Sequence, residues 1–147
     1  MIRAMEIEDY DGVHSLWMGI KGFAIRSIDD SRIGVERFIR RNEGISVVAI
    51  EDEKIVGAIL CGHDGRRGCL YHVCVDPDYR LKGIGTQMVT ECMKALQKEN
   101  ISKVSLIAFA KNDIGNTFWK KIGWEQRLDL NYYEFVLNTE NITKFNE

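Results

Sequence analysis

The sequence predicts an α/β protein with a central mixed, mostly antiparallel sheet and helices on both faces. Short apolar runs bounded by turn residues alternate with segments in which apolar residues recur at helical spacing. The expected order is strand, helix, helix, three strands, helix, strand, helix and two strands. Helices interspersed in this way among the strands of one sheet have to pack on its faces.

The first half of the chain opens with a strand over residues 2–5 and a helix over residues 7–20. Tyr10, Val13 and Leu16 fall on one side of that helix. Residues 19–30 are expected to form a loop. Ser31 is expected to cap a second helix, which Gly44 ends.

Strands are expected over residues 45–50, 54–61 and 70–75, joined by turns at residues 52–53 and 64–67. A helix reaching residue 98 is followed by a strand over residues 102–109. A short helix over residues 113–122 stops at Gly123. Residues 125–128 and 132–137 are expected to form a closing hairpin, and the polar tail from Asn138 is expected to fray.

Length and composition agree with a single domain spanning residues 1–147. The net charge of −2 argues against a nucleic-acid-binding protein, which is usually basic. The N-terminal residues lack the pattern of a signal peptide, and no apolar run approaches the ~18 residues of a membrane helix. These features predict a cytoplasmic protein without a membrane partner.

The most informative stretch is residues 70–86, LYHVCVDPDYRLKGIGT. An apolar strand ends at Asp76-Pro77, and a basic loop with two glycines leads into a helix. The loop residues are Arg80, Leu81, Lys82, Gly83, Ile84, Gly85 and Thr86. This order directs backbone N–H groups and the positive end of a helix at one point, where a phosphate or pyrophosphate is the natural ligand. The glycines let the backbone approach it closely.

The spacing excludes two familiar phosphate motifs. No G-x-x-x-x-G-K-[ST] run is present, and the third glycine of G-x-G-x-x-G is replaced by Met88. What remains is R-x-x-G-x-G between a strand and a helix. This run has two alternative interpretations. It could be a tight structural turn without a ligand, or it could belong to another phosphate-binding protein that matches the pattern by coincidence.

The same stretch resembles motif A of the GNAT N-acetyltransferases, [RQ]-x-x-G-x-[GA]. Residues 112–124, NDIGNTFWKKIGW, resemble the family's N-x-x-x-x-x-[LF]-Y-x-x-x-G-[FY] helix and turn. The resemblance covers residues 1–137, and the G-x-D-G-x-R-G hairpin is similar to that of a small bacterial branch of the family.

The resemblance implies an N-acetyltransferase that moves an acetyl group from acetyl-CoA to a primary amine of a small molecule or protein, directly and within a ternary complex. The Arg80–Thr86 loop would hold the pyrophosphate. The fourth and fifth strands, over residues 70–75 and 102–109, would splay where the co-substrate enters. Other implied cofactor-binding residues are Val73, Cys74, Val75, Asn112 and Trp119. No metal and no nucleic acid are expected, and the protein would be a monomer or homodimer. An acyl-CoA-binding module with little turnover is the alternative.

The chain departs from the family at two catalytic positions. Trp119 stands where the family has a tyrosine that serves as the general acid. An indole N–H cannot give up its proton at neutral pH, so Trp119 cannot take that role. The strand VSLIAFA lacks the carboxylate that another branch uses. An oxyanion donor could still come from the backbone N–H near Val73.

Tyr71 and His72 are the remaining catalytic candidates. Because strand side chains alternate, only one of them is expected to face the substrate, and Tyr71 is the predicted catalytic residue. Either could instead be a core residue. Asp29 and Asp30 could attract an amine cation, although their simpler role is favourable charge at a helix N-terminus.

The four cysteines form no C-x-x-C pair, which argues against a zinc or thioredoxin-type site. Buried, reduced thiols are expected, with an acetyl-carrying Cys74 as the alternative. His14 and His63 are expected to be structural or exposed. Tyr132 and Tyr133 are expected to pack in the closing hairpin or to line a substrate mouth.

Overall fold

The computed structural model describes residues 1–147 and contains a five-stranded sheet in the order β1-β3-β4-β5-β6. Neighbouring strands are antiparallel except for the parallel pair β5–β6, so the predicted mixed sheet is confirmed. The strand bounds are β1 Ile2–Ala4, β3 Val47–Glu51, β4 Lys54–His63, β5 Gly68–Val75 and β6 Val104–Leu106.

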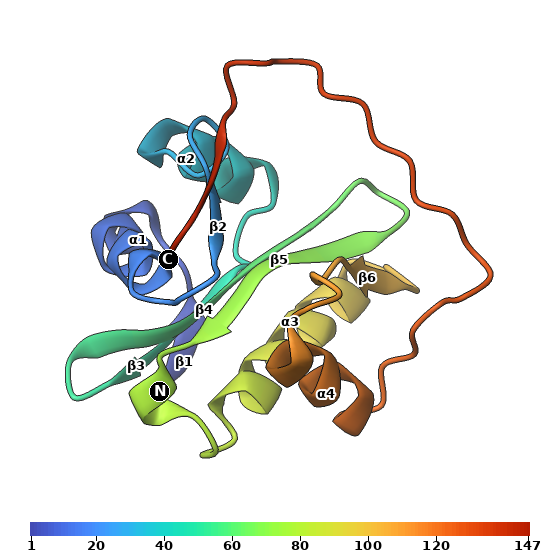
Figure 1. Cartoon of the computed structure of the whole chain (residues 1–147). Coiled ribbons are helices and arrows are strands. Elements are labelled where there is room, and N and C mark those ends of the chain that lie inside the picture. The colour runs from blue at the N-terminus through green and yellow to red at the C-terminus, as the bar shows by residue number, and fades with distance from the viewer.

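Helices cover both faces of this sheet, as predicted (Figure 1). On one face lie α1 (Tyr10–Met18) and α2 (Arg32–Arg41), which bury Val13, Trp17 and Val35 against β3, β4 and β5. On the other face lies α3 (Ile84–Lys98), whose Met88 and Cys92 are fully buried. The short α4 (Asp113–Lys121) packs beside α3 through half-buried aromatic residues. No helix is both long and apolar enough to cross a membrane.

The local signals for caps and turns are confirmed. Ser31 Oγ accepts a hydrogen bond from the Gly34 N–H and caps α2. Asp52 and Glu53 both have positive φ at the turn between β3 and β4. Asp64 Oδ1 accepts the N–H groups of two following residues in the next hairpin. A 3₁₀ turn, η1 (Ile7–Asp9), precedes α1, so the first helix begins later than expected.

Two predictions for the chain ends are wrong. Part of the expected loop at residues 19–30 forms β2 (Ala24–Arg26), which pairs with β7 (Thr143–Phe145) in the expected frayed tail. Polar side chains fix the tail: Asn146 Nδ2 donates to Trp17 O and Ile20 O, at 2.7 and 2.8 Å. A polar tail of this kind is predicted to be disordered because its hydrogen-bond partners lie more than a hundred residues away in the sequence.

The expected closing hairpin is absent. Residues 125–137 contain no strand and form no backbone hydrogen bond. The expected strand over residues 102–109 is reduced to Val104–Leu106. Alternating apolar residues do favour extended backbone, but a strand also needs an adjacent edge with which to pair, and here the segment runs clear of the sheet (Figure 1).

Candidate active site

The loop before α3 leaves backbone donors free at the helix start. In α3, Gln87 N–H is the first to bond backward, to Gly83 O at 3.0 Å. The N–H groups of Ile84, Gly85 and Thr86 therefore have no acceptor within the helix. Together with the positive end of a 15-residue helix, they form a site with the chemistry of an anion cradle.

The two glycines of the loop have different structural roles. Gly83 caps α3 with φ +80°, and a Cβ placed there would meet no atom within 4 Å. A Cβ on Gly85 would instead lie 3.3 Å from Phe118 Cζ of α4. Gly85 therefore permits close packing of α3 against α4, and the expectation that both glycines keep Cβ atoms away from a phosphate stays a prediction.

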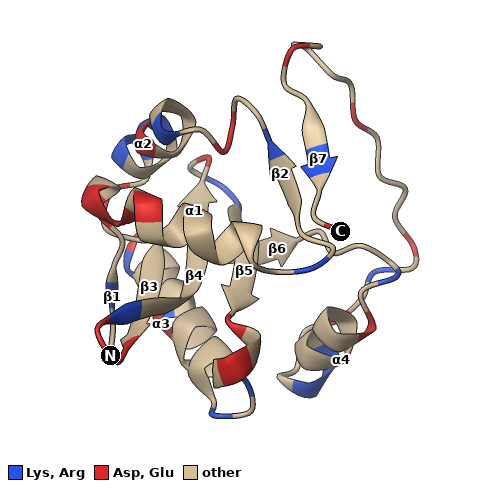
Figure 2. Cartoon of the chain, turned by 60° about the vertical axis from the view of Figure 1, so that its left-hand side comes forward, with Lys and Arg blue, Asp and Glu red and all other residues tan.

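Two basic residues, Arg80 and Lys82, lie in the loop that leads into α3 and are coloured blue in Figure 2. Arg80 Nε donates to Val75 O at 3.1 Å and so fastens the loop to the end of β5. Lys82 Nζ lies 5.1 Å from the centre of the Tyr79 ring, a cation–π geometry. Leu81, between them, has φ +64° and is fully exposed. Both charges therefore belong to the short loop that ends at the free N–H groups.

Near this loop, β5 is no longer paired with β6. β6 pairs with β5 only along residues 68–70, while β4 stays paired with β5 as far as Val75. Cys74 faces Ala58 of β4, and the Asp76 N–H donates to Val56 O. Because backbone groups alternate along the regular part of the strand, those of Val75 point away from β4, to the side on which β6 no longer pairs.

A bulge in β5 changes which way the catalytic candidates face. Two residues, His72 and Val73, stand opposite the single residue Ile59 of β4, and His72 has φ +51°. Tyr71 then packs edge-on against Phe38 of α2, and His72 packs against Trp17 of α1. The expectation that Tyr71 and His72 lie on opposite faces is therefore wrong, because the bulge interrupts the alternation.

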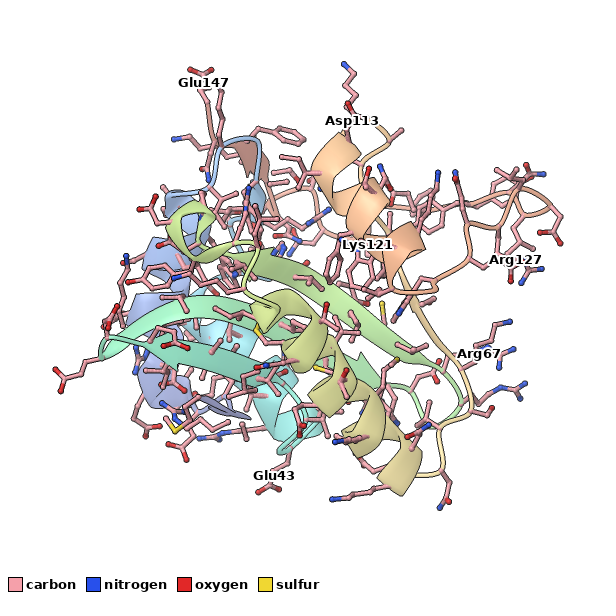
Figure 3. All side chains as sticks on the ribbon, turned by 90° about the horizontal axis from the view of Figure 1, so that it is seen from below. Glu43, Arg67, Asp113, Lys121, Arg127 and Glu147 are labelled. Carbon is pink, nitrogen blue, oxygen red and sulfur yellow. The ribbon has the colours of Figure 1, made fainter.

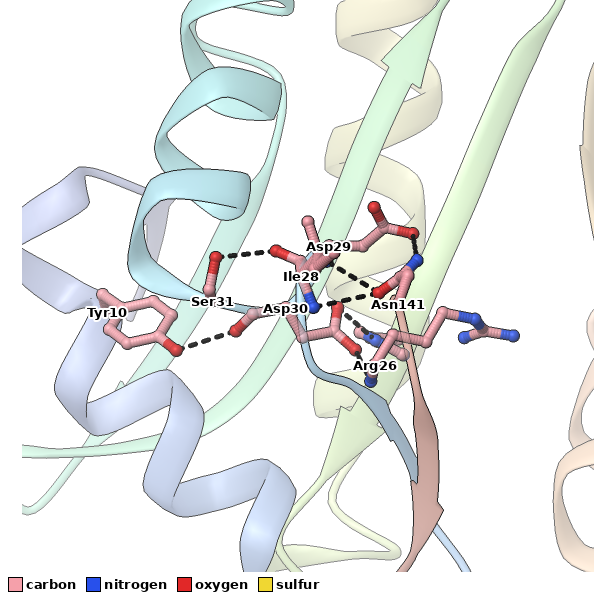
Figure 4. A network of polar contacts seen from close by, with 8 residues as sticks. Tyr10, Arg26, Ile28, Asp29, Asp30, Ser31 and Asn141 are labelled. Atoms are coloured by element: carbon pink, nitrogen blue, oxygen red, sulfur yellow. Dashed lines mark hydrogen bonds and ion pairs between the residues drawn. The ribbon is translucent and has the colours of Figure 1, made fainter. Parts of the chain in front are cut away.

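His72 is held by a buried carboxylate. His72 Nε2 lies 2.8 Å from Asp30 Oδ1, with side-chain exposures of 14% and 5%. Asp30 Oδ2 accepts the Arg26 N–H at 2.7 Å, and its carbonyl accepts the Tyr10 hydroxyl at 2.7 Å (Figure 4). Since a carboxylate only accepts, Nε2 carries the hydrogen and Nδ1 of a neutral ring has the free lone pair.

Nδ1 of His72 is available to a ligand. It has no hydrogen-bond partner in the protein. It is also not fully enclosed, because Trp17 Nε1 is the only side-chain N or O atom that is both enclosed and without a partner. The rings of Trp17 and Phe23 both lie 4.8 Å from the imidazole. His72 thus has a fixed orientation, a buried anion behind it and an open nitrogen in front, which is the arrangement of a proton acceptor.

The other two candidates keep their protons. A hydrogen bond with Cys69, together with burial, raises the pKa of Tyr71 to about 12. Full burial raises the pKa of the Cys74 thiol to about 12, and its Sγ lies against Ala58 O at 3.9 Å. An acetyl-carrying Cys74 is therefore disfavoured, because the thiolate is the nucleophile and is scarce at neutral pH.

Comparison with known proteins identifies the family. The model of a protein family described as "Acetyltransferase (GNAT) family" matches residues 10–124, well over half of the chain. The chain belongs to this family. The match spans the loop, β5 and α4, so an unrelated phosphate-binding protein is excluded.

Bacterial relatives agree with this assignment. An acetyltransferase of Sodalis glossinidius (strain morsitans) is 29% identical over 126 residues, which cover 86% of this chain and 87% of the relative. An acetyltransferase of Pectobacterium atrosepticum is 28% identical over 124 residues, with 84% and 86% covered. The relatives establish an acetyltransferase and leave the acceptor open.

Solved structures share the GNAT fold. The PaiA N-acetyltransferase of Thermoplasma acidophilum, solved with coenzyme A, has a TM-score of 0.71 at 20% identity and covers 84% of this chain and 87% of its own. The aminoglycoside acetyltransferase AAC(6')-Iy, solved with a bisubstrate analogue, has a TM-score of 0.72 at 16% identity, with 92% and 97% covered.

The remaining predicted residues of this GNAT chain lie around the α3–α4 side. Asn112 caps α4, its Oδ1 accepting the Gly115 N–H at 3.0 Å. Trp119 is half-buried, with its ring 5.0 Å from that of Phe118 and 4.8 Å from that of Trp124. Ile84 is a core residue, so only its backbone can serve a ligand.

Sequence reasoning missed the role of Asp30, which was assigned to helix charge, and the aromatic surround from Trp17 and Phe23. Asp30 and His72 are 42 residues apart and meet only because the loop before α2 folds over β5. The histidine itself was the only available signal. Two surface hollows lie between β1 and α3. One, lined by Ile45, Ala95 and Glu99, reaches none of these groups, whereas the other includes Thr86 beside Glu91 and Lys94.

Proposed function

We propose that this GNAT protein transfers an acetyl group from acetyl-CoA to a primary amine of a small molecule or protein, within a ternary complex. The observation that carries the proposal is the set of free N–H groups at the start of α3, directly after the strand that β6 has left. A pyrophosphate fits there because its oxygens can accept these N–H groups near a helix dipole.

The residues that would hold acetyl-CoA follow from these positions. The N–H groups of Ile84, Gly85 and Thr86, with the charges of Arg80 and Lys82, would bind the pyrophosphate. The backbone groups of Val73 and Val75 would hydrogen-bond the pantetheine arm along the open side of β5. Leu81, Gly83 and Cys74 would shape the site through backbone conformation and packing. Bound acetyl-CoA supplies an activated acetyl thioester.

Asn112 and Trp119 would complete the other wall of the site. The Asn112 Oδ1 is engaged in capping α4, so its amide nitrogen is the group left to donate. Trp119 would shield the thioester with its ring. The Val73 N–H, in the bulge of β5, would stabilise negative charge on the reacting carbonyl oxygen.

The proton chemistry falls to His72 more readily than to Tyr71. His72 Nδ1 would take a proton from the amine, directly or through one water, while Asp30 stabilises the imidazolium that results. Tyr71, the residue predicted from the sequence, would act as a hydrogen-bond donor, because its raised pKa keeps the hydroxyl protonated.

An amine acceptor is consistent with structural neighbours that differ widely in substrate. One neighbour was solved with an aminoglycoside-type bisubstrate analogue, and another, the NatC complex, with a peptide and CoA. The proposed acetyl acceptor of this chain is therefore a primary amine of either a small molecule or a protein.

The test is the release of free CoA thiol with a panel of small amines and of peptides with free N-termini. Amine-dependent release that Gly83→Val reduces is the expected result. The alternative is an acyl-CoA-binding module, favoured by Trp119 in place of the family's tyrosine. Tight acetyl-CoA binding without release for any amine would establish that alternative, whereas no binding at all would refute both.

A further inference from the structure

The C-terminal segment between α4 and β7 stands off the rest of its own chain. We define the arm as residues 125–137. It forms no backbone hydrogen bond, and its side-chain bonds are local, Arg127 with Asp129 and Tyr132 with Glu134. Figure 1 shows it as a long loop apart from the sheet, and Figure 3 places Arg127 at the outer rim of the molecule.

The arm is apolar along most of its length. Seven large apolar side chains are 61–94% exposed: Leu128, Leu130, Tyr132, Tyr133, Phe135, Val136 and Leu137. Monomeric soluble proteins rarely leave so many neighbouring apolar groups in water. Five of the last six residues of the arm are β-branched, aromatic or leucine, a composition that favours a strand once an edge is available.

The same chain offers an open edge. β6 bonds to β5 on one side only, and nothing pairs with its other side. Ile107 and Phe109, which follow it, are 69% and 51% exposed. No charged residue or proline interrupts residues 104–110, so the edge lacks the features that normally prevent pairing with another strand.

Both ends of the arm are fixed on their own chain. Trp124 N–H donates to Trp119 O at 2.9 Å, and Ile142 N–H donates to Ser27 Oγ at 2.9 Å. Between these anchors the arm forms no hydrogen bond with its own β6. An identical chain presents an identical free edge, so two arms and two edges satisfy each other around a two-fold axis.

We infer that the protein forms a two-fold dimer in which the arm of each chain adds a strand to the β6 edge of the other. Three aromatic side chains on each arm bury about 150–250 Å² apiece when covered. Two exchanged arms would therefore bury an area on the order of the 1,200–2,000 Å² of stable interfaces.

Light scattering on the full chain tests the association. We expect a mass about twice 16.9 kDa. Phe135→Lys in the arm and Ile107→Lys at the edge should each give monomers, because a buried charge opposes pairing. Asn131→Lys is the matched control, since it adds the same charge to the arm without removing an apolar group, and it should remain dimeric. A monomeric parent protein would overturn the inference.

Cross-linking separates exchange from other contacts. Phe135→Cys protein and Ile107→Cys protein are refolded together and treated with a bismaleimide, with the parent protein as the control for native thiols. A two-chain product in the mixture, absent from either variant alone, is expected. In the double variant, a cross-link confined to one chain would mean that the arm closes on its own edge. That result, or a dimer unaffected by Ile107→Lys, would contradict the inference.

Discussion

Gly83→Val tests the cofactor loop against an internal control, Gly65→Val. Gly83 has φ +80° and Gly65 has φ +90°, and a Cβ at either position meets nothing within 4 Å. Both variants should therefore lose stability by about 1–2 kcal/mol, the cost of a left-handed backbone for an L-residue. Only Gly83 borders the free N–H groups of α3, so only its substitution should disturb an anion bound there.

The expected loss of affinity follows from the hydrogen bonds at stake. A hydrogen bond to a charged group contributes about 1.5–3 kcal/mol, so losing the alignment of one N–H should weaken acetyl-CoA binding by about 10- to 150-fold. Calorimetric titration measures the affinity and thermal unfolding measures the stability. Equal affinities for the folded Gly83→Val and Gly65→Val proteins would refute the placement of the pyrophosphate.

Three further predictions concern the proton acceptor, the thioester wall and the N-terminal ion pair. His72→Gln should lower kcat by about 10²–10⁴-fold in steady-state assays, while acetyl-CoA affinity is unchanged. Trp119→Tyr should leave kcat flat or lower it, and a gain above about tenfold in steady-state assays would show that a missing general acid limits turnover. The Arg3 guanidinium, 2.8 Å from Asp9, holds the pKa of that carboxyl below its usual range. This pair stabilises the fold above the unfolded carboxyl pKa of about 3.9 and is lost as pH falls through the lower folded value. Asp9→Asn should therefore lower Tm near neutral pH and flatten its fall in acid.

Features set by local chemistry were predictable from the sequence. The Ser31 cap, the Asp52-Glu53 turn and the loop before α3 each depend on residues within a few positions of one another. Apolar periodicity predicted most of the strands and helices as far as α4 along the chain, and with them a mixed sheet covered on both faces. The family resemblance added the parting of β5 from β6, which no local pattern encodes.

Features set by distant partners were not predictable. The bulge that turns His72 toward α1 arises from the pairing of β5 with β4, and the sequence of β5 alone reads as regular alternation. Asp30 reaches His72 only through the folded loop before α2. β2 and β7 have only three residues each, and they become strands because they pair with each other. The arm shows the converse: it has the composition of a strand but pairs with no strand of its own chain.

The most direct test of the central assignment is an amide NMR titration of the labelled protein with CoA. The account predicts that the largest shifts occur at the N–H groups of residues 82–86, with further shifts at Val73 and Val75. Hydrogen bonding of these amides to phosphate and pantetheine oxygens is the physical reason. Shifts concentrated instead at the β1–α3 hollow around Ala95 and Glu99, with residues 82–86 unmoved, would contradict the assignment.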